Sequence, residues 1–386
     1  MMRTALVIGG GIGGLAAALA LARRGLSVRL MEQAAEISEV GAGLQISPNG
    51  LVVLRALGVE QALDKGGAVQ AEAVVLEDYA AGKQVARLDL GRLKDRRYLF
   101  VHRADLIAAL LMAAQDAGIS IALGRKAIAL SPGECSEVVF EDGTCESADV
   151  VVCADGLHSV GRGAINGATQ AQFTGQVAWR ATVPVAQAAA VATVTMGPGR
   201  HIVSYPLRGG ALMNVVAVEE RDQWSEEGWQ HEGSPETLRR VFADFGGPVS
   251  DVLKRIDQVY LWGLFRHPVA ETWVKGNAVL LGDAAHPTLP FLAQGANMAL
   301  EDAWALASVV KGPGPLTRYE AVRKDRAKRI VDTASRNAWK YHLPHGPLRL
   351  AAHRALALGS RVAPGHMMGQ FDWLYTYDIT REMPQT

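Results

Sequence analysis

The chain has 386 residues, of which 49% are hydrophobic and 20% are charged, and its 39 basic residues balance its 39 acidic ones. This apolar content excludes a largely disordered chain. The zero net charge argues against general attraction to nucleic acid or to an anionic membrane surface, because both need a basic excess. A small molecule is therefore the expected partner. The length suggests about two domains, and 41 glycines exceed the roughly 27 that average usage gives.

The cysteines favour a reduced, cytoplasmic setting. Cys135, Cys145 and Cys153 are an odd number and too few for a disulfide framework in a chain of this length, and their spacing is too wide for a metal site. We therefore predict no metal centre. The uncharged stretch from Thr4 to Ala22 is rich in glycine, so a strand, a turn and a helix start explain it better than a membrane span.

The first elements form a βαβ unit. An apolar strand at Ala5–Ile8 is followed by an alanine- and leucine-rich helix at Leu15–Arg24, which Gly25 closes. A second apolar strand follows at Leu26–Met31, and Glu32 stands at its carboxyl end. This order within about 30 residues is typical of the start of a doubly wound sheet.

The turn inside this unit carries a dinucleotide fingerprint. Gly9, Gly11 and Gly14 satisfy G-x-G-x-x-G, with Gly13 also in the turn, and the helix that follows would offer its N-terminal N–H groups to a pyrophosphate. Glu32 could accept two ribose hydroxyls and would repel a 2′-phosphate, which disfavours NADP. At this point the bound nucleotide could be NAD or FAD.

Further elements follow up to residue 153. They are a helix starting at Ser47-Pro48, strands within residues 70–90 around a turn at Gly82, a helix at His102–Ala117, a strand at Ile119–Leu123, a hairpin turning at Glu141–Gly143 and a buried strand at Val150–Cys153.

The pattern changes between Phe173 and Leu264, where apolar runs alternate with turn residues as in an antiparallel sheet. We predict an α/β fold in which residues 173–270 form an inserted, mainly antiparallel substrate domain of α+β character. Residues 1–172 form the first part of a Rossmann-like nucleotide-binding domain, with segments around 70–100 on the substrate side. Residues 271–386 complete that domain and add C-terminal helices.

The chain returns to the first domain with a strand at Ala278–Leu281 and helices at about Ala296–Lys311 and Leu316–Tyr341. The last helix is basic, with Arg323 and Arg326 among six cationic residues. Because acidic residues are interleaved with them, we interpret this pattern as a solvated helix face rather than a binding patch.

Two later segments favour FAD over NAD as the bound nucleotide. Asp155-Gly156 follows one buried strand and Gly282-Asp283 follows another, so both belong at the carboxyl edge of the sheet, where ligands of such folds bind. With these residues the chain resembles the class A FAD-dependent aromatic-ring monooxygenases, closest to the salicylate, 3-hydroxybenzoate and 6-hydroxynicotinate hydroxylases. The resemblance covers nearly the whole chain and also includes the segments Gly41–Asn49, His102–Leu106 and Pro290–Asn297.

The resemblance implies a set of FAD contacts at matching positions. Besides the glycines of the fingerprint, these are Glu32 and Gln33 near the adenosine ribose, Ala127 near the adenine, Gln45, Arg103 near the ribityl and pyrophosphate groups, Asp155, Asp283 at the ribityl chain, and Gly295 and Ala296 at the flavin. Cys153 stands where the family usually has glycine. The dipole of the helix that begins at Gln294–Asn297 would stabilise the reduced flavin.

The same resemblance implies the reaction. Reduced FAD would react with O₂ to form a C4a-hydroperoxide, which hydroxylates an electron-rich ring. No second glycine fingerprint is present, so NADH or NADPH would bind transiently, and the sequence does not choose between them. The enzyme would be a single component, a monomer or homodimer, without nucleic-acid partners.

His201 and Tyr205 are the catalytic candidates, because they are four residues apart on an expected strand and so face the same side. His201 could equally be a structural histidine. Pro290 and Phe291 would form an apolar wall suited to a benzene ring, and Arg180 either pairs with a substrate carboxylate or, more often for such an arginine, joins a structural salt bridge. The expected substrate is a salicylate- or hydroxybenzoate-like acid. The alternatives are a flavin reductase or oxidase of this fold and an FAD-bound redox sensor or binding module.

Overall fold

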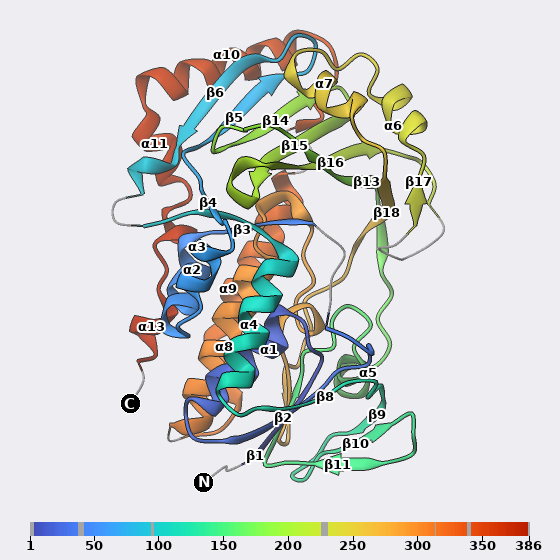
Figure 1. The fold of residues 1–386 in the computed structure, drawn as a ribbon, viewed down its shortest axis with the longest axis vertical. Helices are drawn as coiled ribbons and strands as arrows, with labels where there is room; N and C mark the ends of the chain where they lie inside the picture. The colour runs from blue at the N-terminus through green and yellow to red at the C-terminus, as the bar shows by residue number, and fades with distance from the viewer. Residues whose placement is uncertain are drawn as a thin grey trace.

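The computed structural model describes residues 4–37, 42–93, 96–224, 231–312, 314–337 and 341–384. Gly41 of the expected Gly41–Asn49 segment lies outside them. A parallel sheet lies at one end of the long axis and a larger sheet at the other, and long helices run between the two (Figure 1). Within the described residues, no helix is both long enough and apolar enough to span a bilayer.

The first sheet has six strands in the order β19-β20-β12-β1-β2-β8. All its pairs are parallel except the hairpin of β19 and β20. Its strands are β1 (Thr4–Ile8), β2 (Ser27–Met31), β8 (Ser120–Ala122), β12 (Val150–Cys153), β19 (Val274–Lys275) and β20 (Ala278–Leu280). The apolar runs bounded by glycine thus form buried strands, as the sequence predicts, because both faces of this sheet are covered.

Seven helices accompany this sheet: α1 (Ile12–Ala22), α2 (Pro48–Ala56), α3 (Glu60–Lys65), α4 (Arg103–Asp116), α5 (Val160–Asn166), α8 (Gly295–Lys311) and α9 (Thr317–Asn337). Helix α8 is the central one, since it packs against α1, α2 and α9 and buries nearly every side chain. Two three-stranded sheets complete this part, one of β9 (Ala127–Ser131), β10 (Glu137–Phe140) and β11 (Cys145–Ser147), the other of β3 (Gly43–Ile46), β4 (Val69–Gln70) and β7 (Leu99–His102).

The second sheet has eight strands in the order β17-β18-β13-β16-β15-β14-β5-β6. It is antiparallel, as expected, except that β14 and β5 run parallel. Its strands are β5 (Ala73–Asp78), β6 (Lys83–Asp89), β13 (Gln172–Pro184), β14 (Val191–Gly197), β15 (Arg200–Leu207), β16 (Leu212–Glu220), β17 (Glu232–Gly233) and β18 (Val259–Arg266). The hairpin of β5 and β6 turns at Gly82, whose φ of +64° suits glycine.

The two faces of the second sheet bury different partners. Val177, Trp179 and Ile202 point to one face and pack with α6 (Pro235–Val241) and α7 (Pro248–Lys254). Ala178, Val218 and their neighbours point to the other face, toward the first sheet, where they pack with Leu289 and Phe291. We call this second surface the inner face.

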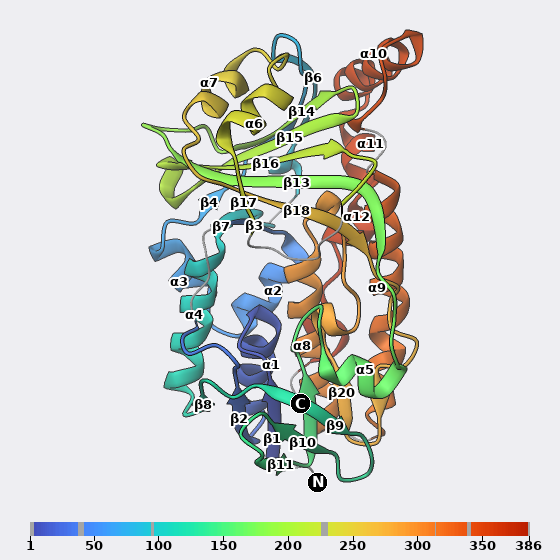
Figure 2. The ribbon, with the colours of Figure 1, turned by 90° about the vertical axis from the view of Figure 1, so that its right-hand side faces the viewer.

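The C-terminal helices extend over both parts. Helix α10 (Pro347–Val362) packs against β6, and α11 (Pro364–Gly369) also contacts that strand. Both views show α10 beside the eight-stranded sheet (Figure 2). Helix α13 (Ile379–Glu382) instead contacts α2 and α8, and the short α12 (Asp372–Tyr375) also contacts α2.

The interpretation of α9 as a solvated basic face is wrong for two of its arginines. Arg323 is fully buried and Arg326 nearly so. Both pair with Glu301, and Arg323 also pairs with Asp302 of α8. These two arginines are therefore paired across the interface with α8, whereas Lys324 pairs with Glu320 within α9 itself.

Candidate functional site

The fingerprint glycines shape the start of α1 for close backbone approach. Gly9 has φ of +102°, and a Cβ there would lie 2.4 Å from the Ala154 oxygen. A Cβ at Gly14 would lie 1.9 Å from the Gly9 oxygen, and one at Gly13 would press on Leu281. At Gly11, in contrast, a Cβ would meet nothing within 4 Å. Gly11 is also the N-cap residue and gives α1 no side-chain cap, so the first N–H groups of the helix can receive an anion.

Glu32 is held in place at the end of β2. Its Oε2 accepts a hydrogen bond from the Gly10 N–H at 2.6 Å, and its Oε1 accepts one from the Ala34 N–H at 2.8 Å. A carboxylate has about four acceptor positions, so each oxygen keeps capacity for a ligand hydroxyl. Gln33 is exposed beside it.

The carboxylate of Asp155 is committed to its own helix. It accepts hydrogen bonds from Ser159 Oγ at 2.5 Å and from the Val160 N–H at 2.8 Å, at the start of α5. Burial raises the pKa of Asp155, and these bonds oppose that rise. The structure therefore gives this residue a helix-capping role. Ala127 begins β9, in the separate three-stranded sheet.

Asp283 follows β20, in the 3-10 turn Gly282–Ala284 at the carboxyl end of that strand. Its side chain is exposed, yet the surrounding protein desolvates it and raises its pKa. The charges of His286, Arg103 and His267 oppose that rise. Arg103 opens α4, so the structure brings two of the predicted residues, Arg103 and Asp283, into electrostatic contact.

The turn that carries Asp283 rests on a buried set of charges, His286, Glu301, Asp302, Arg323 and Arg326, which we call the α8 cluster. Asp302 Oδ2 accepts a hydrogen bond from the Gly282 N–H at 3.2 Å and lies 2.5 Å from His286 Nε2. Arg323 Nε donates to Asp302 Oδ1 at 2.8 Å. Burial alone would raise the pKa of Asp302, but the charges of His286 and Arg323 lower it to about 2. The cluster thus keeps its carboxylates ionised while fixing the turn.

Buried amides join the start of α8 to the start of α2. Gln294 Nε2 donates to Ser47 Oγ at 2.9 Å, and Asn49 Nδ2 donates to Glu301 Oε1 at 2.6 Å. Asn297 Nδ2 donates to the Gln45 carbonyl at 3.0 Å. Ser47 is the N-cap residue of α2, as predicted, but its hydroxyl donates to Asn49 rather than capping the helix backbone. The Gln45 side chain is occupied separately, by the Tyr98 hydroxyl at 2.8 Å.

Helix α8 begins without a side-chain cap and without an acidic residue in its first turn. Its first N–H groups, at Gly295 and Ala296, are therefore suited to partial negative charge. The preceding segment places Pro290 exposed and Phe291 buried against the inner face. That Pro290 and Phe291 form a wall for the substrate stays a prediction.

His201 and Tyr205 project from β15 on the inner face. The strand register pairs His201 with Val218, Val203 with Val216, and Tyr205 with Asn214. Since Val216 also pairs with Arg180 of β13, Arg180 lies in the row between the two candidates. The expectation that His201 and Tyr205 share one face is confirmed, while their catalytic roles stay a prediction.

The two side chains have different neighbours. His201 is 1% exposed, its ring lies 5.8 Å from that of Phe291, and its Nδ1 is hydrogen-bonded to His342 Nε2 at 2.6 Å. Burial, and then the charge of His342, lower the pKa of His201 well below its usual value. The neutral imidazole is therefore the resident form.

Tyr205 packs against the start of β3, where a Cβ at Gly43 would lie 2.5 Å from its ring. Its ring centre is 5.1 Å from that of Phe100. Burial raises the pKa of Tyr205, and the charge of Arg180 partly offsets that rise. Arg180 itself lies over the Trp262 ring at 4.6 Å.

Sequence reasoning missed two polar residues of this region. Asn214 is fully buried, and its Oδ1 accepts a hydrogen bond from the Gly43 N–H at 2.8 Å. An asparagine within the apolar run Leu212–Val218 is a signal that could have revealed it. His342 has no such signal, because it lies in a connection between two helices.

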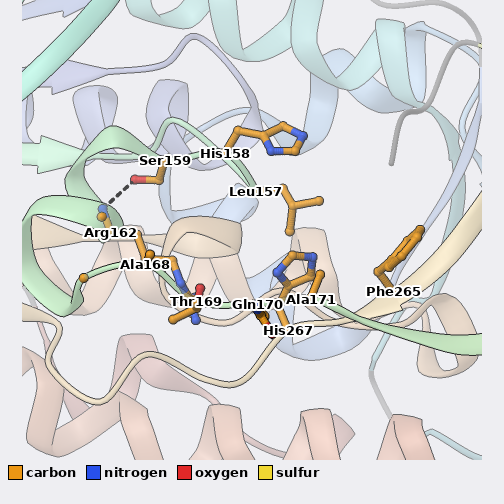
Figure 3. Close-up of a pocket in the computed structure, with 12 residues that line it drawn as sticks. Leu157, His158, Ser159, Arg162, Ala168, Thr169, Gln170, Ala171, Phe265 and His267 are labelled. Carbon is orange, nitrogen blue, oxygen red and sulfur yellow. Dashed lines mark hydrogen bonds between the residues drawn. The ribbon is translucent and has the colours of Figure 1, made fainter. Parts of the chain in front are cut away.

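A separate cavity of about 510 Å³ lies beside α5. Figure 3 shows His158, His267 and Phe265 around it, with Arg162 hydrogen-bonded to Ser159. Its lining comes from residues 157–171 and the end of β18 and includes neither Asp283 nor His201. It adjoins the Asp283 turn, because His267 both lines it and acts on the charge of Asp283.

Comparison with known proteins agrees with the geometry. Residues 2–334 match the family model described as an FAD binding domain. A 3-amino-4-hydroxybenzoate 2-monooxygenase of Streptomyces platensis is 33% identical, covering 96% of this chain and 95% of the relative. A 3-hydroxybenzoate 6-hydroxylase of Polaromonas naphthalenivorans is 35% identical over 97% of this chain and 96% of its own. The crystal structure of Klebsiella pneumoniae HpxO with FAD and uric acid aligns with a TM-score of 0.83 at 26% identity, covering 95% and 96% of the two chains.

Proposed function

The chain belongs to the class A FAD-dependent aromatic monooxygenases, and on that premise we propose that it hydroxylates a phenolic acid of the hydroxybenzoate class. FAD is its cofactor and NADH or NADPH its co-substrate. Two relatives are named for hydroxybenzoates, which supports this class of substrate.

The residues between the sheets fit FAD. The uncapped start of α1 would receive the pyrophosphate, Glu32 the adenosine ribose, and Arg103 and Asp283 the ribityl region. The uncapped start of α8 would face the flavin ring. When bound and reduced, FAD activates O₂ for transfer of one oxygen atom to the ring of the substrate.

The inner face supplies what a phenolic acid needs. The neutral imidazole of His201 can accept the phenol proton, which makes the ring a better nucleophile. The guanidinium of Arg180, two strands away, offers a counter-charge for the carboxylate. Phe291, 5.8 Å from the His201 ring, provides apolar contact for a benzene ring and excludes water. This arrangement of acceptor, cation and apolar wall carries the proposal.

The test is a substrate panel on the purified flavoprotein. NADH and NADPH oxidation is followed with salicylate, 3-hydroxybenzoate, 4-hydroxybenzoate and 3-amino-4-hydroxybenzoate, and hydroxylated product is separated from peroxide. We expect at least one acid to stimulate oxidation and to give product in proportion. Oxidation that no acid changes would point instead to a reductase, an oxidase or a redox sensor.

We also propose a cytoplasmic location. All three cysteines are free thiols, two of them exposed, which suits a reducing compartment. Fractionation of the native host, with blotting for the protein, tests this.

A further inference from the structure

A hydrogen-bonded path leads from His201 to the surface of the second sheet. His201 Nδ1 lies 2.6 Å from His342 Nε2, and His342 Nδ1 lies 2.8 Å from Glu220 Oε1. The first two side chains are buried, at 1% and 5% exposed, whereas the Glu220 side chain is 55% exposed. Three groups therefore join the inner face to solvent.

The partners of His342 determine which nitrogen carries each proton. The Glu220 carboxylate can only accept, so His342 Nδ1 carries the hydrogen and donates it. Its Nε2 is then an acceptor, and His201 Nδ1 must donate to it. His201 Nε2 is therefore the unprotonated nitrogen, which can accept a proton. Gln176 Nε2, itself a donor, also lies 3.3 Å from His342 Nδ1 and favours the opposite role for that nitrogen, but the 2.8 Å contact to the Glu220 carboxylate is shorter and is to an ionised acceptor, so it decides the assignment.

Backbone hydrogen bonds hold His342 and Glu220 next to each other. The Gly199 N–H donates to the His342 carbonyl at 3.2 Å, and the Glu220 N–H donates to the Gly199 carbonyl at 3.0 Å. Two further rings lie near His201, that of Phe291 at 5.8 Å and that of Tyr341 at 5.3 Å. Nearby Arg200 turns its guanidinium to Val241 and Asp244, away from the path.

We propose that His201, His342 and Glu220 form a proton relay, here called the histidine relay, which carries the phenol proton of the bound substrate to solvent. The relay rests on the proposed function, because the phenol is its proton source. His201 touches the substrate, while His342 and Glu220 act through it.

The proton balance is complete. The phenol O–H breaks as an N–H forms at His201 Nε2. The Nδ1–H of His201 breaks as an N–H forms at His342 Nε2, and the Nδ1–H of His342 breaks as Glu220 Oε1 is protonated and then releases its proton to water. The reverse sequence returns a proton when the product leaves. Burial lowers the pKa of both histidines, so neither holds the proton for long.

A chromophoric phenol tests the relay without hydroxylation. The holoenzyme in its oxidised form is mixed in a stopped-flow instrument with 3-hydroxy-4-nitrobenzoate, whose phenolate absorbs visible light. We expect Glu220→Gln and His342→Gln to slow phenolate formation by roughly tenfold or more, with the dissociation constant of the probe unchanged. The matched surface variant Asp222→Asn, at an exposed position outside the relay, should keep the wild-type rate.

Chemical rescue separates proton transfer from a structural effect. Formate added to Glu220→Gln should restore the rate in proportion to its concentration, because the missing carboxylate lies at the surface. Formate should leave Asp222→Asn unchanged.

Each failure has a distinct signature. If the wild type ionises the probe and both relay variants ionise it equally fast, the relay is wrong and the proposed function stands. A slow Glu220→Gln without rescue would also overturn the relay. If the wild type neither binds nor ionises the probe and hydroxylates no member of the panel, the proposed function fails and the relay with it.

Discussion

Two buried histidines of this protein have first partners at similar distances but different surroundings. His286 lies 2.5 Å from Asp302, and His201 lies 2.6 Å from His342. Beyond them, the α8 cluster continues to Arg323, which is fully buried, whereas the histidine relay continues to Glu220, which is 55% exposed. The first group is closed to solvent and the second is open.

The difference separates two uses of buried polar groups. In a closed group every charge has a fixed partner, so removing one member leaves another uncompensated. The α8 cluster accordingly fixes the Gly282-Asp283 turn. In an open group a proton can pass to solvent and leave no uncompensated charge buried, so such a group is suited to proton transfer. Three experiments test this distinction, and a fourth tests the predicted contact of Glu32 with FAD.

The largest effect is expected from opening the closed group. Arg323→Met leaves Glu301 and Asp302 short of a buried partner, and such losses typically cost about 3–5 kcal/mol. Urea unfolding of the holoenzyme measures this. Arg318→Met, at an exposed position of the same helix, should cost less than about 0.5 kcal/mol. Equal losses in the two variants would mean that the cluster has no special role.

The open group should affect chemistry rather than stability. His201→Gln removes the acceptor for the phenol proton, and we expect a roughly 100-fold lower rate of hydroxylated product with unchanged affinity for FAD. Product analysis and flavin titration give the two quantities. His366→Gln, at an exposed position, serves as the control. An unchanged yield of product in His201→Gln would remove His201 from the active site.

The closed group also predicts an acid limit to stability. The folded pKa of Asp302, about 2, lies below its usual value of 3.8, so its contribution is full above about pH 4 and is lost as the pH falls toward 2. By linkage this amounts to roughly 2 kcal/mol. Unfolding free energies of the wild type should fall by about that much more over this range than those of Asp302→Asn. Parallel curves would contradict the lowered pKa.

The smallest effect is expected at Glu32, the predicted contact to the adenosine ribose of FAD. In Glu32→Gln one oxygen becomes an NH₂ group, which cannot accept from the Gly10 N–H or from a ribose hydroxyl. We expect a roughly tenfold weaker affinity for FAD, about 1.4 kcal/mol, measured by flavin fluorescence on titrating apoprotein. Glu36→Gln, four residues on and exposed, should bind FAD like the wild type. Equal binding by both variants would argue against a ribose role.

The sequence predicts the first sheet well because its strands are local signals. Ala5–Ile8 and Val150–Cys153 are apolar runs ended by turn residues, and both are strands of the structure. The alternation around His201 and Tyr205 likewise gives their common face. These features depend on neighbours within a few residues.

The features that the sequence does not predict depend on contacts between residues that are far apart in the chain. His342 meets His201 across 141 residues of sequence, and nothing local distinguishes it from a surface histidine. Arg323 has the sequence surroundings of an exposed arginine, and only the packing of α9 on α8 buries it. The capping of α5 by the Asp155 carboxylate is a local contact, and the role of Asp155 at FAD stays a prediction.

The side-chain hydrogen bonds between α2 and α8 have a consequence for how this protein folds. Asn49 and Glu301, which they join, are 252 positions apart in the sequence, and the whole second sheet is synthesised between them. Closing so long a loop is a slow, entropically costly step. The flavin pocket is therefore expected to be among the last regions to become native, and a nascent chain that ends before α8 would have the nucleotide fingerprint but no completed pocket.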